Sequence, residues 1–443
     1  MISLGCAKNL VNSEQMMYLL RKAGHTLTGD VSDADVNIVN TCGFLESARQ
    51  EAVDQILELA PLRGKIVVAG CLAELVKEEI FTELPEVSAI VGCGSFDRIV
   101  KAAEAAYAGE KFSAFDALGA SVSETPRVVT GCNGECRPDG GISAKSAYLK
   151  ISEGCSNHCA YCLIPTIRGA HVSRPVERIL EEAQTLASGG VREIILVAQD
   201  LTRYGIDLYG APRLCELLNK LCETEGIRWI RLHYLYPNEF TDELIDVIAS
   251  RDKIIKYIDM PIQHCSDEIL RAMNRRGSKK QLEELIQKLK ERIPGIVIRT
   301  TVITGFPGET QAHHLEMCDF LARHRLPRVG AFAYSAEDGT PASEFPGQVP
   351  EETKLRRQEQ IMTLQRDIMD SFNETRIGQT VDVIYEGYDR LAETFYGRSF
   401  AESPDVDGKI FFSSKTVPGD FTRVLIESAD NGDLFGTAEE DLL

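Results

Sequence analysis

Short apolar runs alternate with amphipathic segments along residues 1–100. The amphipathic segments have helical periodicity, as in SEQMMYLLRKAG, where Ser13 is a suitable N-cap and Gly24 a suitable C-cap. This alternation is typical of a parallel sheet with crossover helices. The four expected strands are ISL (2–4), DVNIVN (35–40), KIVVA (65–69) and SAIVG (88–92).

The alternation resumes beyond residue 144, where helical segments such as RILEEAQTLASGG and QLEELIQKLKERI separate further apolar runs. Six such βα units predict a partial TIM-like barrel, whose functional site lies at the carboxyl ends of the strands. The expected strands are YLKI (148–151), EIILVA (193–198), WIRLHY (229–234), YIDMPI (257–262), VIRTTVI (297–303) and VGAFAY (329–334).

Two segments depart from this pattern. The stretch between the two α/β regions contains Gly, Pro and Ser and indicates a linker. The tail holds the short runs TVDVIYEG, KIFFSS and FTRVLIES, which predict the strands of a small β-barrel. We therefore expect an α/β protein with an N-terminal domain (1–110), a linker (111–143), a barrel domain (144–375) and a β-rich tail (376–443).

The composition narrows the functional class. The chain has 443 residues and a formal net charge of −19, which argues against general affinity for nucleic acid, since that affinity rests on Lys and Arg. No apolar run reaches the roughly 18–20 residues that a membrane span needs. The first residues lack the pattern of a signal peptide. We expect a cytoplasmic protein that contacts no membrane and does not bind nucleic acid directly.

Thirteen cysteines, an odd number with irregular spacing, favour metal or redox chemistry over disulfides in a reducing compartment. Cys155, Cys159 and Cys162 lie together in EGCSNHCAYCL (153–163). A structural zinc site takes four ligands. Three thiolates on one loop instead suit three corners of an iron–sulfur cluster, with one iron left open. His158 could supply a fourth ligand, but it directly precedes Cys159, and adjacent side chains on a tight loop tend to point apart.

A second set of cysteines is predicted by the fold. Cys6, Cys42 and Cys71 each follow an expected strand of the N-terminal sheet by one to three residues. Because ligands of open α/β sheets lie beyond the carboxyl ends of the strands, we expect these three cysteines on one edge. Cys93 also follows an expected strand and could be a fourth ligand, and the spacing leaves this open.

Cys132 and Cys136 have the same three-residue gap as the first two cysteines of the loop motif. Asp139 stands where a third cysteine would be needed, and the stretch GCNGECRPDG indicates a linker. We therefore interpret this pair as unrelated to metal binding.

The loop motif, with Tyr161 before its last cysteine, resembles the signature of radical S-adenosylmethionine (SAM) enzymes. The resemblance implies that SAM chelates the open iron and is cleaved to a 5′-deoxyadenosyl radical. It also implies that Tyr161 packs beside the adenine and that TGFPGET (304–310), with Gly305 and Gly308, contacts SAM. Further polar residues near strand ends are candidate SAM contacts: Gln199, Asp200, Gln263 and Arg299, of which Arg299 could instead neutralise a carboxylate or be structural.

The whole chain resembles the methylthiotransferase family, which combines a cysteine-bearing α/β domain, a radical SAM domain and a β-rich tail. The resemblance implies two 4Fe–4S clusters, one held by Cys6, Cys42 and Cys71 and the other by Cys155, Cys159 and Cys162. Cys93 has no role in this pattern, so we interpret it as a packing residue. The chain starts only a few residues before Cys6, and we expect that N-terminal residues are missing.

The opening ISLGCAKNLVNSE resembles the branch that modifies an aspartate of small-subunit ribosomal protein S-twelve. The tail, which resembles a TRAM domain, has 6 Lys/Arg against 14 Asp/Glu. Because an RNA-binding barrel should be basic, this acidic tail favours a basic protein substrate.

The alternative substrate is adenosine-37 of transfer RNA, the target of the other branch. An iron–sulfur electron carrier is a more remote alternative, since it would need neither the barrel nor sites with three rather than four thiolates. The resemblance to methylthiotransferases implies an electron donor such as flavodoxin or ferredoxin.

Overall fold

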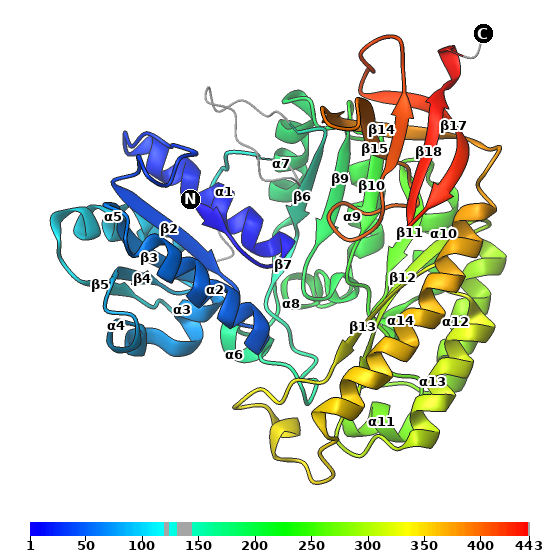
Figure 1. Cartoon of the computed structure of the whole chain (residues 1–443), viewed down its shortest axis with the longest axis horizontal. Coiled ribbons are helices and arrows are strands. Elements are labelled where there is room, and N and C mark those ends of the chain that lie inside the picture. The colour runs from blue at the N-terminus through cyan, green and yellow to red at the C-terminus, as the bar shows by residue number, and fades with distance from the viewer. Residues whose placement is uncertain (119–123, 131–143, 442–443) are drawn as a thin grey trace.

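The computed structural model describes residues 1–118, 124–130 and 144–441. The expected α/β fold class is confirmed, with two parallel sheets and a closed barrel at the tail (Figure 1). Cys132 and Cys136 lie outside the described residues. In the part of the chain that is described, no helix combines the length and the apolar character needed to cross a membrane.

The N-terminal sheet is parallel and its strands follow one another in chain order. Helices cover both faces: one buried cluster joins α1 and α5 to the sheet, and another joins α2 and α3 to it. The strands are β1 (Ile2–Ser3), β2 (Val36–Thr41), β3 (Lys65–Gly70), β4 (Val87–Val91) and β5 (Phe112–Ala114). The helices are α1 (Ala7–Lys22), α2 (Glu46–Leu59), α3 (Cys71–Val76), α4 (Ile80–Glu83) and α5 (Ile99–Ala108).

Strand β5 lies in the segment expected to be a linker. It pairs with β4 through Ala89 and Phe112 and extends the N-terminal sheet beyond residue 110. With three residues, none of them fully buried, it lacks the apolar run that identified the other strands.

The central sheet has six parallel strands in the order β13-β12-β11-β10-β9-β6. They are β6 (Ser146–Lys150), β9 (Glu193–Val197), β10 (Trp229–Leu232), β11 (Ile254–Asp259), β12 (Val297–Thr304) and β13 (Arg328–Ala333). The sheet does not close, which agrees with the predicted partial barrel. A short pair, β7 (Ser152–Glu153) and β8 (Val172–Ser173), follows β6.

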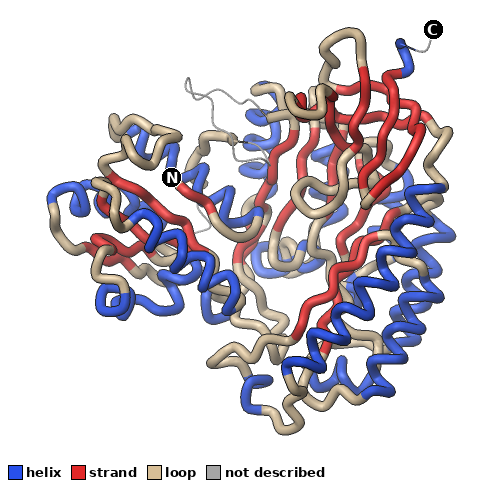
Figure 2. Tube along the Cα trace, viewed as in Figure 1, coloured by secondary structure: helices blue, strands red, loops and turns tan. Residues whose placement is uncertain are grey.

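Helices cover the outer face of the central sheet and form the largest buried apolar cluster with it (Figure 2). The longer ones are α7 (Val176–Ser188), α9 (Leu214–Cys222), α10 (Asp242–Ser250), α12 (Lys279–Arg292), α13 (Gln311–His324) and α14 (Glu351–Glu374). Short helices lie in the loops: α6 (Ile164–Arg168), α8 (Ile206–Tyr209) and α11 (Asp267–Ala272).

Helix α1 of the N-terminal domain covers part of the inner face of the central sheet. Its Val11, with Leu10 packed alongside, contacts Tyr148, Ile195 and Val197 on β6 and β9. Because strand side chains alternate between faces, these sheet residues point away from the outer helices. The N-terminal domain therefore closes the side that the incomplete barrel leaves open.

The tail forms a closed five-stranded barrel in the order β14-β15-β16-β18-β17. Its strands are β14 (Thr380–Asp389), β15 (Thr394–Arg398), β16 (Ile410–Ser413), β17 (Phe421–Asp430) and β18 (Asp433–Ala438). The barrel packs on the amino ends of the central strands, where Ile384 and Ala401 share a buried cluster with Trp229 and Val297.

Buried ion pairs join the tail to the same amino ends. Glu193, the first residue of β9, pairs with Arg231 at 2.8 Å and with Arg398 of β15 at 2.7 Å, and the side chains of Glu193 and Arg231 have no exposed area. The two guanidinium groups hold the pKa of Glu193 well below its usual value despite burial, which on its own would raise it. The carboxylate therefore remains ionised between two cations.

Replacing Glu193 by Gln should remove the ion-pair partner of the buried Arg231 guanidinium, while Arg398 keeps its pair with Glu386 at 2.7 Å. Removing one partner of a buried pair typically costs about 3–5 kcal/mol of unfolding free energy, to be measured by urea denaturation followed by circular dichroism. The control is Asp382→Asn, because Asp382 pairs with Arg228 at 2.6 Å across the same two domains but is solvent-exposed. That change should cost about 1 kcal/mol or less. Equal effects of the two substitutions would contradict the role assigned to Glu193.

Candidate active site

Cys155, Cys159 and Cys162 lie on one loop between β7 and α6, each partly buried. The loop is closed by a hydrogen bond from the Cys155 amide to the Gly169 carbonyl at 3.1 Å. Gly154 before it has a φ of +74°, and a Cβ there would lie 2.0 Å from the Ala170 carbonyl oxygen. The tight approach of the two ends of this loop therefore requires glycine at position 154.

His158 adopts a positive φ of 52° and is exposed. Its carbonyl accepts a hydrogen bond from the Asn274 amide at 2.8 Å, which fixes the backbone at this point. That the three cysteines act without this histidine stays a prediction.

Several expected SAM contacts gather around the cysteine loop. Asp200 accepts a hydrogen bond from Asn157 of the loop at 2.7 Å, and Gln199 donates to Glu153 at 2.7 Å. Tyr161 of the loop packs with Phe306, which lies between Gly305 and Gly308. The segment TGFPGET therefore lies beside the cysteine loop although more than a hundred residues separate them.

The two glycines of that segment have different surroundings. A Cβ on Gly305 would lie 2.3 Å from Cγ of Lys354 in α14, so its close approach is to the protein itself. A Cβ on Gly308 would meet no atom within 4 Å. Gln263 follows β11 in a bridge to Val302 with a φ of 69°.

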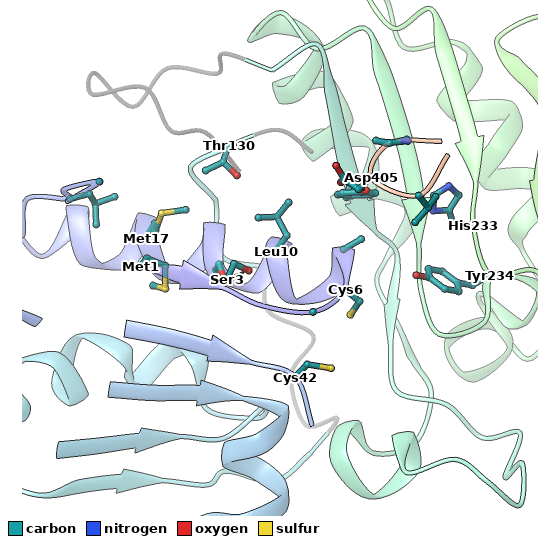
Figure 3. A pocket seen from close by; sticks show the side chains of 18 of the residues that line it. Met1, Ser3, Cys6, Leu10, Met17, Cys42, Thr130, His233, Tyr234 and Asp405 are labelled. Carbon is teal, nitrogen blue, oxygen red and sulfur yellow. Dashed lines mark hydrogen bonds between the residues drawn. The ribbon is translucent and has the colours of Figure 1, made fainter. Parts of the chain in front are cut away.

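Cys6, Cys42 and Cys71 lie together at the carboxyl edge of the N-terminal sheet, after β1, β2 and β3. Figure 3 shows the first two, Cys6 and Cys42. A Cβ on Gly5, which has a φ of +85°, would lie 2.8 Å from Cβ and 3.2 Å from Sγ of Cys42. A Cβ on Gly43 would lie 2.8 Å from the backbone of Cys71. Glycine next to Cys6 and next to Cys42 therefore lets the three loops approach one another.

Cys93 is a neighbour of this group. Its thiol donates to Sγ of Cys71 across 4.0 Å, and both cysteines pack with Leu163 and Ile167 of the loop and helix that follow Cys162. Cys93 thus has apolar surroundings, while its thiol also contacts Cys71, a predicted cluster ligand.

The thiols differ in acidity. Burial raises the pKa of Cys42 to about 11 and that of Cys162 to about 12. The pKa of Cys71 is lowered to about 6, first by the hydrogen bond from Cys93 and then by the positive charge of Arg168. The thiolate form is therefore best stabilised at Cys71.

A cavity of about 1420 Å³ lies between the three domains. The N-terminal domain contributes Cys6 and Cys42, and the tail contributes the loop Pro404–Val406, so parts of the chain far apart in sequence share its wall. The central strands contribute His233, Tyr234, Asp259 and Arg299. Figure 3 shows Cys6, Tyr234 and Asp405 around it.

Arg299, a candidate SAM contact, lines this cavity. Its guanidinium donates to Asp259 at 3.0 Å, and both side chains line the cavity wall. Burial opposes the charge of Arg299, but Asp259 outweighs it and raises the pKa of Arg299 above its usual value. The cavity wall that contains Cys6 and Cys42 therefore also contains a permanently charged guanidinium, paired with Asp259.

Sequence reasoning missed the tail loop. Asp405 accepts a hydrogen bond from the Tyr148 hydroxyl at 3.3 Å, and Ser403 bonds His233 at 2.9 Å between its hydroxyl and Nε2. The only signal was the turn-forming stretch SPDVDG, in which Asp405 has a φ of 66°.

The chemistry of the donor sets fits an iron–sulfur cluster, because each set consists of three cysteine thiols. Within the described ranges, no three His, Cys, Asp or Glu side chains are arranged to hold one metal ion. A cubane takes one thiolate at each of several separate irons, so its ligands need not converge on one point. Thiolates without accompanying carboxylates or imidazoles are the ligands that iron–sulfur clusters prefer.

Three family models match the chain: the Radical SAM superfamily over residues 149–321, Uncharacterized protein family UPF0004 over 1–92 and the TRAM domain over 377–438. Among solved structures, the chain is similar to the radical S-adenosylmethionine methyltransferase TsrM from Kitasatospora setae. The TM-score is 0.52 at 14% identity, over 76% of this chain and 74% of that one, which shows a shared fold.

Curated relatives are similar over almost the whole chain, and each bears the name ribosomal protein uS12 methylthiotransferase RimO. The protein of Lachnoclostridium phytofermentans is 45% identical over 99% of both chains. Those of Pelotomaculum thermopropionicum and Desulforamulus reducens are 45% and 46% identical over 98% of both chains. At this identity and coverage, the chain belongs to the family of ribosomal protein uS12 methylthiotransferases.

Proposed function

We propose that this protein attaches a methylthio group to the β-carbon of an aspartate in ribosomal protein uS12. The observation that carries the proposal is the cavity in which the N-terminal cysteines, the central strand ends and the acidic tail loop meet. The relatives named above act, by name, on a ribosomal protein, which favours this substrate over adenosine-37 of transfer RNA.

In this proposal each set of three cysteines holds a 4Fe–4S cluster: Cys6, Cys42 and Cys71 the first, and Cys155, Cys159 and Cys162 the second. When bound, the clusters and SAM supply the removal of hydrogen from an unactivated carbon and the methylthio group that replaces it. The cysteine loops would fix where these groups lie.

The residues around the Cys155 loop would hold SAM. Tyr161 would pack beside its adenine, and the backbone at Gly308 is open to a close approach. Gln199 and Asp200, already hydrogen-bonded to the loop and its flank, would orient the polar part of SAM. Gln263 and Gly305 would line the rest of the SAM site.

The cavity would receive the substrate side chain. Arg299 offers a cation for the aspartate carboxylate. Lys8 offers a second, because it is 7% exposed and its Nζ lies 3.6 Å from the ring centroid of Tyr234, a cavity residue. Arg299 and Lys8 would pair with a carboxylate-bearing residue and would find no counter-charge on an adenine base, while Asp259 and Asp405 also line the cavity.

The chain would further need a one-electron donor such as flavodoxin or ferredoxin, and we propose that it works in the cytoplasm on the basic substrate protein. The domain limits 1–110, 111–143, 144–375 and 376–443 stay part of this proposal. The acidic tail would attract the Lys- and Arg-rich surface of the substrate.

Anaerobically reconstituted protein should contain about eight irons, four per cluster. Replacing Cys155, Cys159 and Cys162 together by Ala should leave about four irons and abolish SAM cleavage, as measured by iron analysis and chromatography of 5′-deoxyadenosine. SAM cleavage by this triple variant would contradict the assignment of the radical chemistry to this loop.

The triple variant of Cys6, Cys42 and Cys71 to Ala should still cleave SAM but form no methylthiolated uS12 peptide in mass spectrometry. Cys93→Ala is the matched control, because Cys93 contacts Cys71 at 4.0 Å without belonging to the predicted set. It should keep the iron and the product. Loss of the N-terminal iron in Cys93→Ala would establish a fourth thiolate ligand and overturn the assigned role of that cluster.

Neutralising exposed tail carboxylates should slow association with uS12 and weaken its salt dependence, because exposed charges are screened over about 8 Å at physiological ionic strength. Suitable positions are Glu393, Asp430 and Glu440, which are exposed. Asp407 and Asp433 are unsuitable, since they accept hydrogen bonds from Tyr257 and from the Lys409 amide.

The control for the tail variant neutralises Glu51, Asp54 and Glu58, equally exposed carboxylates on α2 of the N-terminal domain. This change removes the same charge and should leave the association rate unaltered in stopped-flow measurements. Methylthiolation of transfer RNA by the purified enzyme, with uS12 unmodified under the same conditions, would refute the substrate assignment.

A further inference from the structure

Arg168 is a buried arginine that the predicted site did not include. It is the last residue of α6, the helix that begins two residues after Cys162, and it is 2% exposed. Its guanidinium donates to three side chains of the N-terminal domain. These are Asn9, Asn12 at 3.1 Å and Sγ of Cys71 at 3.2 Å.

The same guanidinium also binds the central domain. It donates to both carboxylate oxygens of Glu153, at 3.1 and 3.2 Å. Glu153 stands two residues before Cys155 and is itself held by Lys150 at 2.8 Å and by Gln199 at 2.7 Å. One side chain therefore connects a predicted ligand of the N-terminal cysteine set to the strand that leads into the other set.

Only a planar guanidinium group has enough N–H donors to bind all of these acceptors. Arginine presents five N–H donors in fixed directions, whereas a lysine ammonium is a compact point charge on a flexible stem. The side chain of Asn9 is itself held in place, because its amide also donates to the carbonyl of Thr41 at 2.9 Å. Thr41 directly precedes Cys42. The contacts of Arg168 thus extend to the loops of two N-terminal cysteines.

We propose that Arg168 is a positioning residue with two effects. It fixes the position of the two cysteine sets relative to each other, and it raises the reduction potential of the cluster at Cys6, Cys42 and Cys71. The inference rests on the proposed function for the clusters and deepens it. Potentials of iron–sulfur clusters depend on hydrogen bonds to the sulfurs and on nearby charge. A cationic donor at Cys71 stabilises the more negative, reduced state, so removing it makes reduction harder.

Arg127 provides a matched control. It is a second buried arginine between the same domains, since it pairs with Glu14 of α1 and with Glu182 of α7 at 2.8 Å. Its side chain is 4% exposed, and within the described ranges it binds Glu14, Glu182 and the Tyr148 carbonyl but no cysteine. Arg127→Lys therefore perturbs the domain contact without touching either cysteine set.

The experiment uses reconstituted full-length protein with Arg168→Gln, Arg168→Lys or Arg127→Lys. The potential of the N-terminal cluster is measured by redox titration followed by electron paramagnetic resonance, with Cys155, Cys159 and Cys162 replaced by Ala so that one cluster gives the signal. In otherwise unaltered protein, the ratio of SAM cleaved to methylthiolated uS12 peptide is measured together with iron content and melting temperature.

We expect Arg168→Gln to keep its iron, to shift the potential to more negative values and to raise the SAM-to-product ratio about tenfold or more. Arg168→Lys keeps the positive charge, so the potential of the N-terminal cluster should lie closer to the wild-type value than in Arg168→Gln. The ratio of SAM cleaved to product should stay high, because lysine lacks the planar set of donors that arginine provides. Arg127→Lys should leave both quantities unchanged. The Lys variant separates the two effects and remains informative if the Gln variant folds poorly.

The proposal is overturned if both Arg168 variants have the wild-type potential and ratio, or if Arg127→Lys reproduces their changes. It is also overturned if both Arg168 variants lose the N-terminal iron at an unchanged melting temperature, since the residue would then retain the cluster rather than tune it. Failure of the proposed function is distinguishable, because wild-type protein would then form no methylthiolated peptide while the titration would still report on Arg168.

Discussion

Parallel strand pairing is the constraint on which both cysteine sites depend. In a parallel sheet every strand ends on the same edge, so residues that follow different strands meet although they are distant in sequence. Cys6, Cys42 and Cys71 meet in this way, while the Cys155 loop follows the edge strand β6 of the central sheet. Glycines at the crowded points let the backbones come close enough.

The domains are joined through buried charge as well as apolar packing. Glu193 with Arg231 and Arg398 ties the tail to the central strands, and Arg168 with Glu153 ties the N-terminal domain to the cysteine loop. Such pairs add little net stability over an apolar contact, but a displaced partner would leave an uncompensated charge. They therefore disfavour alternative arrangements of the domains more than they strengthen the native one.

Much of the fold follows from the sequence, because long apolar runs mark the buried parallel strands and spacing marks the cysteine motif. The predicted methylthiotransferase family and its ribosomal-protein branch are confirmed by the relatives. Short half-buried strands such as β5 have too few apolar residues to be recognised. The contacts of Arg168 and the place of Asp405 in the cavity wall escaped prediction, because both depend on distant segments that pack together. Gly305 remains a predicted SAM contact, and its proximity to Lys354 of α14 could not be read from the sequence.

The tail barrel sits on the amino ends of the central strands, and the Cys155 loop follows their carboxyl ends. Strands of this length span roughly 15–25 Å. Among the described residues of the tail, only the turn at residues 404–406 lines the cavity. The tail thus meets the cavity through one short turn, and the outer surface of its barrel can vary in sequence without changing the cavity wall.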